Sequence, residues 1–212
     1  MVTSGNPRRI AFIALMAALG NVMFVVSQTI FKTGQIALDL SHIGTFVAAV
    51  YGGPLMGLIT GLMVGIGPGL YFGYLGGSLG LLGLIGLPVG KALTGITVGY
   101  LARIFRIDSA KHPSWKVPLA TLVGYVPEAL FTISFFESLV PIFLPDMASY
   151  LMAQPGSMYA FVISLMAKAW IEIAILTVFM STLIGNNGFN EFVRRVFTKP
   201  YMLSKLKANQ SA

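Results

Sequence analysis

Long apolar stretches separated by short polar breaks dominate the chain. No Asp, Glu, Lys or Arg occurs between Leu40 and Gly90. A transmembrane helix needs about 20 mainly apolar residues because the hydrocarbon core of a bilayer is about 30 Å thick. The pattern predicts six membrane-spanning helices, at about Ile10–Phe31, Ser41–Tyr51, Leu55–Tyr74, Leu84–Leu101, Val117–Phe136 and Ser157–Leu183.

The second predicted helix, Ser41–Tyr51, is short for a hydrocarbon core, so we expect neighbouring helices rather than lipid to shield it. The apolar region Ile36–Arg103 breaks at Gly52-Gly53-Pro54, after this helix, and in the glycine-rich segment 76–87, after the third. The predicted fold class is therefore an all-α polytopic membrane protein. Its parts are a short N-terminus (1–9), a six-helix transmembrane domain (10–186) and a basic C-terminal tail (187–212).

The basic residues predict the orientation. Eleven of the fourteen fall into three clusters, which are Arg8 and Arg9; Arg103, Arg106, Lys111 and Lys116; and Arg194, Arg195, Lys199, Lys205 and Lys207. Six crossings place all three clusters on one side of the membrane. Positive charge marks the cytoplasmic side, so both termini are expected inside, in a multi-pass protein of the cell membrane.

Composition agrees with a membrane protein. Hydrophobic residues make up 56% of the chain and charged residues only 10%, whereas soluble domains carry roughly 25%. The net charge of +7 is concentrated in the three clusters, so we expect a solvated basic end, with contacts to anionic lipid, rather than a nucleic-acid partner. There is no cysteine, which excludes disulfides and thiolate metal sites.

Four ionisable residues interrupt the apolar stretches: Lys91, Glu128, Lys168 and Glu172. A charge at the centre of a membrane helix costs about 2.5–3.5 kcal/mol on insertion scales, so such residues face a protein interior or a water-filled cavity. Counted at ~1.5 Å per residue from the basic clusters, Lys91, Glu128 and Asn21 lie roughly 18 Å from the inner end of their helices. All five residues are expected in one layer, in the middle to outer half of the membrane.

Each of these residues also has a purely structural interpretation. Lys168 and Glu172 are four residues apart, so they share a helix face and could neutralise each other without touching a ligand. Lys91 could extend its ammonium group to the outer interface. Trp170 faces elsewhere and is expected in packing or lipid contact.

Tyr125, Glu128, Thr132 and Phe135 form one stripe of the fifth helix. The stripe could be an ordinary interface between helices, but the carboxylate favours a binding pocket. We expect no metal site at Asp39 and His42. No metalloprotease, nucleophile-elbow or Walker A motif occurs, so catalysis is disfavoured and no cofactor is expected on this chain.

The first predicted helix carries a strip of small residues, Ala11, Ala14 and Ala18. Small residues one turn apart let another helix approach closely in a membrane. The strip could serve packing within the chain or docking of another subunit.

Over about residues 8–186 the chain resembles the substrate-binding S component of an energy-coupling factor (ECF) vitamin transporter. The resemblance rests on the size, the six spans, the Ala14-x-x-x-Ala18 strip and two loose motifs. These motifs are Leu38-Asp39-Leu40-Ser41 with Tyr51-Gly52-Gly53-Pro54-Leu55-Met56-Gly57, and Gly90-Lys91-Ala92-Leu93-Thr94-Gly95 with Gly99-Tyr100-Leu101-Ala102-Arg103.

The resemblance implies a mechanism. An S component captures a vitamin or related nutrient from outside and docks through its first helix onto a transmembrane coupling (T) subunit, which two cytosolic ATPases drive with ATP. Here Ala11, Ala14 and Ala18 would form the docking strip. A lid loop would include Gln35, Asp39 and Ser41.

The expected substrate-binding residues are Asn21, Lys91, Tyr125, Glu128, Thr132, Phe135, Lys168 and Glu172. They favour a small, partly aromatic, zwitterionic nutrient, since rings can stack on Tyr125 and Phe135. The alternatives are a stand-alone secondary transporter that uses the intramembrane charges as an ion or proton relay, a structural or assembly protein, and an intramembrane enzyme.

Overall fold

The computed structural model describes residues 7–30, 32–33, 36–77, 79–107, 115–153 and 157–197. The helices are α1 (Pro7–Ile30), α2 (His42–Gly52), α3 (Pro54–Leu70), α4 (Gly80–Ile104), α5 (Lys116–Ser134), α6 (Val140–Phe143), α7 (Pro145–Ala153), α8 (Ser157–Gly185) and α9 (Asn187–Phe197). Two π-helical turns, η1 (Tyr71–Leu75) and η2 (Phe135–Leu139), extend α3 and α5. The prediction of an all-helical fold is confirmed, apart from a hairpin of two-residue strands, β1 (Lys32–Thr33) and β2 (Ile36–Ala37).

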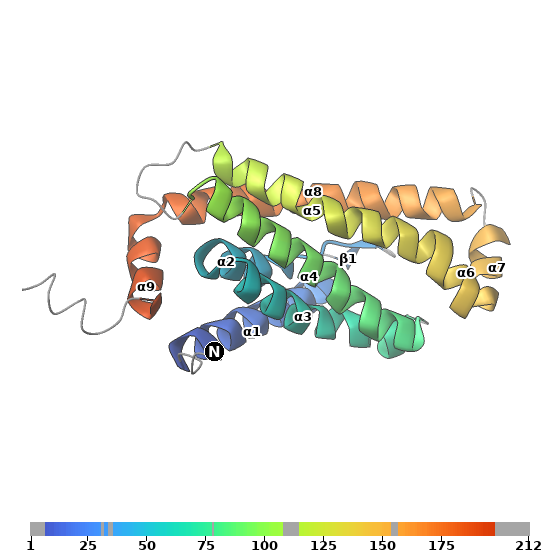
Figure 1. Ribbon diagram of the computed structural model, residues 1–212. Helices are drawn as coiled ribbons and strands as arrows, with labels where there is room; N and C mark the ends of the chain where they lie inside the picture. Colours follow the sequence, from blue (N-terminus) through green and yellow to red (C-terminus); the bar gives the residue numbers. More distant parts are fainter. Residues whose placement is uncertain are drawn as a thin grey trace, which may run out of the picture.

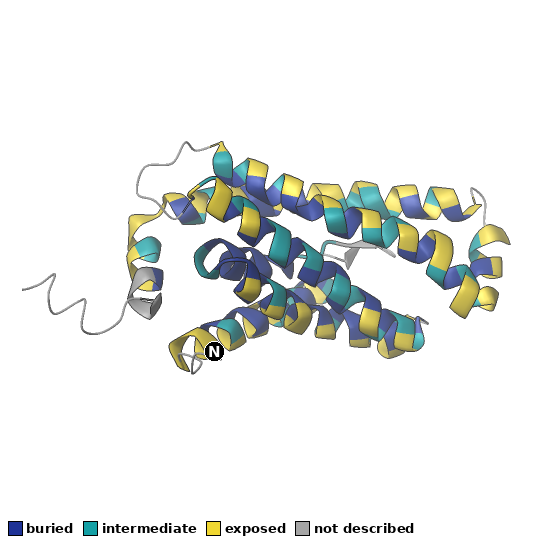
Figure 2. Ribbon diagram, viewed as in Figure 1, coloured by how far each residue is buried: buried dark blue, intermediate teal, exposed yellow. Residues whose placement is uncertain are grey.

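Five helical segments within the described residues are long and apolar enough to cross a membrane. They are Pro7–Ile30, Pro54–Leu75, Gly80–Ile104, Lys116–Phe143 and Ser157–Gly185. These segments run lengthwise through the bundle, and the start of α1 lies at the same end as α9 (Figure 1). Many of their large apolar side chains face outward, as expected where lipid replaces water (Figure 2).

The second predicted span, Ser41–Tyr51, corresponds to α2, which has only 11 residues and is not among the five long segments. At ~1.5 Å per residue it covers roughly 17 Å, about half of a hydrocarbon core. Every residue from His42 to Val50 is buried, and α2 lies inside the bundle against α1, α3, α4 and α8 (Figure 1). The expected shielding by other helices is therefore present, and α2 is an interior helix.

Gly53 separates α2 from α3. Its φ of 83° lies in the left-handed region that favours glycine, and Pro54 then occupies the first position of α3. This arrangement ends one helix and starts the next within a single residue.

The π-helical turns shape the end of the bundle farthest from α9. Pro68 removes a backbone donor inside α3 just before η1, and η2 ends at Leu139, two residues before Pro141. Beyond η2, α6 and α7 form a cap at that end (Figure 1). Single π-helical turns occur frequently at functional sites, and here η1 and η2 supply Phe72, Phe135 and Phe136 to a cavity.

The C-terminal tail was predicted only as a basic segment, but its first part, Asn187–Phe197, is the helix α9. This helix turns away from α8 at the end of the bundle (Figure 1). It is held there because Tyr51 donates a hydrogen bond to Asn190 Oδ1 (2.5 Å), and Phe189 packs edge-on against the Tyr51 ring. The tail beyond residue 197 lies outside the described residues.

Candidate functional site

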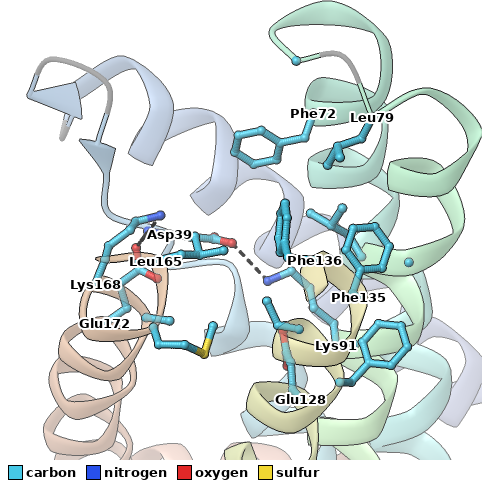
Figure 3. Close-up of a pocket in the computed structure, with 18 of the residues that line it drawn as sticks. Asp39, Phe72, Leu79, Lys91, Glu128, Phe135, Phe136, Leu165, Lys168 and Glu172 are labelled. Carbon is cyan, nitrogen blue, oxygen red and sulfur yellow. Dashed lines mark hydrogen bonds and ion pairs between the residues drawn. The ribbon is translucent and has the colours of Figure 1, made fainter. Parts of the chain in front are cut away.

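A cavity of about 300 Å³ lies between α4, α5, α8 and the segment before α2. It is in the part of the bundle away from α9, since η1, η2 and α7 also contribute to its wall. Figure 3 shows charged side chains gathered along one part of this wall and aromatic rings along another. The lining residues are Asp39, His42, Phe72, Gly77, Leu79, Gly86, Leu87, Gly90, Lys91, Tyr125, Glu128, Phe131, Thr132, Phe135, Phe136, Met147, Phe161, Leu165, Met166, Lys168, Ala169 and Glu172.

Asp39 ties the segment before α2 to two helices. Its Oδ2 lies 3.0 Å from the Lys91 ammonium on α4, and its backbone N–H donates to Oε1 of Glu172 on α8. The Ser41 N–H donates to the other carboxylate oxygen of Asp39 (2.8 Å). Burial would raise the pKa of this carboxyl, but the Lys91 ammonium, His42 and the hydrogen bonds from Ser41 outweigh burial and hold the pKa below its usual value. Asp39 is therefore ionised at neutral pH.

Glu128 on α5 is held by two other helices. Its Oε1 lies 3.3 Å from His42 Nε2 on α2, and Thr94 on α4 donates a hydrogen bond to its Oε2 (2.5 Å). His42 stacks on Phe46 with ring centroids 5.7 Å apart and meets the Tyr125 ring edge-on. This network fixes the carboxylate and the imidazole in the wall of the cavity.

Lys168 and Glu172 form the ion pair that their spacing predicts, with 3.1 Å between Lys168 Nζ and Glu172 Oε1. Both residues also line the cavity, so the two interpretations of the pair are compatible. The Lys168 side chain is 20% exposed, compared with 7% for Glu172.

The rest of the wall is aromatic and apolar. Phe136 packs edge-on against Phe135 and Phe161, with centroid separations of 5.3 and 5.2 Å. Tyr125 packs edge-on against Trp170 at 5.3 Å. Rings held in this way present flat apolar surfaces to a planar molecule.

The structure brings seven of the eight predicted substrate-binding residues to this one cavity: Lys91, Tyr125, Glu128, Thr132, Phe135, Lys168 and Glu172. That they bind a substrate remains a prediction. Of the predicted lid residues, Asp39 lines the cavity, Ser41 is buried beside it, and Gln35 lies outside the described residues.

Asn21 is the exception and does not line the cavity. Its amide donates to the carbonyls of Ala17 and Met63, both at 3.0 Å, and accepts from the Gly67 N–H at 2.9 Å. It therefore joins α1 to α3 immediately before Pro68, where the helix loses a backbone donor. Depth alone placed Asn21 with the charged residues, but Asn21 faces α3, and no residue of α1 lines the cavity among the described residues.

His42 was not predicted as a site residue, and neither were the rings of Phe72, Phe131, Phe136 and Phe161. His42 begins α2, in which every residue from His42 to Val50 is buried. The shielding expected for this short helix was a usable signal. The phenylalanines resemble lipid-facing residues in sequence, so only the fold identifies them. No group of three or more His, Asp or Glu that could hold a metal occurs among the described residues.

The family model "ECF transporter, substrate-specific component" matches residues 8–184, which is most of the chain. The chain belongs to this family. Neither a curated protein nor a solved structure gives a match. The chain is thus a substrate-binding subunit of a transporter rather than an enzyme, and its apolar helices make it a multi-pass membrane protein.

The predicted docking strip of this S component is on the outer surface of α1. Ala11, Ala14 and Ala18 are all exposed, whereas Met16 and Ala17 on the opposite face are buried. The described residues of the chain therefore do not cover this strip.

Proposed function

We propose that this S component captures a small nutrient in the cavity from outside the cell and releases it inward after docking on a coupling subunit. Two cytosolic ATPases would drive that subunit. The observation that carries the proposal is the cavity itself, which combines two lysine–carboxylate ion pairs and the Glu128–His42 contact with an aromatic wall inside an apolar bundle. Charged groups are expensive inside a membrane and are retained there for function.

The distribution of basic residues supports capture from outside. Arg8 and Arg9 lie at the start of α1, Arg103 lies near the end of α4, and Lys116 begins α5. These ends of the helices share the α9 end of the bundle (Figure 1). By the positive-inside rule, this end faces the cytoplasm of the cell. The cavity lies toward the opposite end, where a nutrient would arrive.

The exposed strip on α1 supports docking. Ala14 and Ala18 are one turn apart, with exposed Leu15 and Leu19 beside them. In a bilayer no hydrophobic effect drives apolar helices together, because lipid tails are as apolar as the side chains. Association therefore depends on close packing, which small residues of this kind permit. The partner for such a surface is a membrane-embedded helix of the coupling subunit.

The test is uptake and binding by the full chain. Cells that produce the chain together with a coupling subunit and its ATPases should accumulate a nutrient from the medium, and loss of ATP hydrolysis by the ATPases should abolish accumulation. The purified chain alone should bind the same nutrient. Gradient-driven uptake by proteoliposomes that contain only this chain would instead support a secondary transporter.

A further inference from the structure

Some polar groups in the cavity wall already bind other groups of the protein, and others remain available to a ligand. Both oxygens of Asp39 are engaged, by Lys91 and by the Ser41 N–H. Both oxygens of Glu128 are engaged too, by His42 and Thr94. Two of the three carboxylates in the wall are therefore already held by the protein.

The donors are less fully used. An ammonium group has three N–H donors, but Lys91 and Lys168 each have one partner among the described residues, Asp39 and Glu172 respectively. The Tyr125 hydroxyl likewise makes no hydrogen bond within the described part of the chain, and Tyr125 lines the cavity. The wall thus offers unused donors on Lys91, Lys168 and Tyr125.

The two lysines belong to one connected cluster. Lys91 contacts the Asp39 carboxylate, the Asp39 backbone contacts Glu172, and Glu172 contacts Lys168. Figure 3 shows the two ammonium groups on either side of Asp39, at the polar part of the cavity. The free acceptor in this cluster is Oε2 of Glu172, for which the described residues supply no partner.

We infer that the captured nutrient carries an anionic oxygen group, a carboxylate or phosphate, bound by Lys91 and Lys168, together with an amine or ring N–H that donates to Glu172. Its body is planar and lies against Phe135, Phe136 and Phe161. This inference rests on the proposed function. A ligand with both charges adds no net charge to a wall in which carboxylates already outnumber lysines, and charge-assisted hydrogen bonds are the strong ones.

The experiment uses the full chain purified from cells grown in rich medium. The probe is whatever small molecule heat releases from the protein, identified by mass spectrometry, and then titrated back onto the emptied protein. We expect a heteroaromatic acid, and its fragmentation distinguishes carboxylate from phosphate. Amidation or dephosphorylation of the released molecule should weaken binding roughly 10- to 100-fold, as expected for loss of charge-assisted hydrogen bonds.

Two double variants test the lysines without leaving a carboxylate unpaired: Lys91→Gln with Asp39→Asn, and Lys168→Gln with Glu172→Gln. Each should weaken binding of the released molecule roughly 10-fold or more. Lys116→Gln is the matched control. Lys116 donates to the Phe105 carbonyl, and neither residue lines the cavity, so the variant should leave binding unchanged.

The outcomes separate the inference from the proposed function. A released molecule without an acidic group, or undiminished binding in both folded double variants, overturns the inference and leaves capture intact. Failure to release any molecule, in a protein that also supports no nutrient uptake, overturns the proposed function and the inference with it.

Discussion

The carboxylate of Asp39 lies 3.0 Å from the ammonium group of Lys91, and this contact joins the segment before α2 to the middle of α4. The same segment is anchored to α1, because the Leu40 N–H donates to Ser27 Oγ (3.2 Å). Through Asp39 this segment forms part of the cavity wall. The lid role predicted for it implies that the Asp39–Lys91 pair separates when this side of the cavity opens.

Asp39→Asn should weaken this closure. Asn retains an oxygen for the Ser41 N–H but removes the charge opposite Lys91, which leaves a buried ammonium without its ion-pair partner. We expect dissociation of the bound nutrient to become roughly 10-fold faster, as measured by ligand exchange on the purified protein. Asp146→Asn is the control, because Asp146 is exposed on α7. Equal exchange rates in the two variants would show that the pair does not hold the cavity closed.

The sequence predicted the helices and the pairing of Lys168 with Glu172 because both depend on local spacing. It also indicated the stripe Tyr125, Glu128 and Thr132, since a carboxylate in an apolar helix must face an interior. Such arguments need only one helix at a time.

Pairings between helices could not be predicted in this way. Glu128 contacts His42 and Thr94 from two other helices, and Asp39 contacts Lys91 across 52 positions of sequence. Asn21 was wrongly predicted in the cavity, because depth in the membrane does not say which way a side chain points. The helix α9 was missed because its basic residues resemble those of a solvated tail.

Thr94→Val should expose the contribution of the Glu128 network. The substitution keeps the shape of the side chain but removes the hydroxyl that donates to Glu128 Oε2. A hydrogen bond to a charged group contributes about 1.5–3 kcal/mol, so we expect the free energy of unfolding to fall by about that amount. Thermal unfolding in detergent measures this change. Thr97→Val is the matched control, because the Thr97 hydroxyl donates to the Leu93 carbonyl one turn earlier and has no other partner among the described residues. An equal loss in both variants would contradict a special role for Thr94.

Gly95→Ala should separate α3 from α4. A Cβ at Gly95 would overlap the carbonyl oxygen of Gly57, and a Cβ at Gly57 would overlap the carbonyl oxygen of Gly95. Backbone cannot move aside as a flexible side chain can, and overpacking of this kind typically costs about 1–3 kcal/mol. We expect a lower unfolding temperature and weaker nutrient binding, because Lys91 lies one turn away on α4. Gly185→Ala, where a Cβ meets nothing within 4 Å, should unfold like the parent protein; similar losses in the two variants would rule out the backbone contact as the cause.

Ala14→Trp and Ala18→Trp test whether docking and capture are separate. Both alanines are exposed on α1 and absent from the cavity wall, so an indole there leaves the binding groups untouched. It would, however, hold a neighbouring helix away from a surface whose small residues permit close approach. We expect nutrient binding to the purified variants to stay within about twofold of the parent, a difference of under about 0.5 kcal/mol, while uptake by cells that contain the coupling subunit and ATPases falls to background.

Val178→Trp supplies the control for these two variants, because Val178 is an exposed apolar residue of another membrane helix, α8, and is 69% exposed. Its uptake should match that of the parent, which would exclude a general effect of tryptophan on insertion or expression. If Ala14→Trp and Ala18→Trp lost binding and uptake together while remaining folded, the α1 strip would belong to the capture step. If neither variant lost uptake, the coupling subunit would have to dock on a different surface.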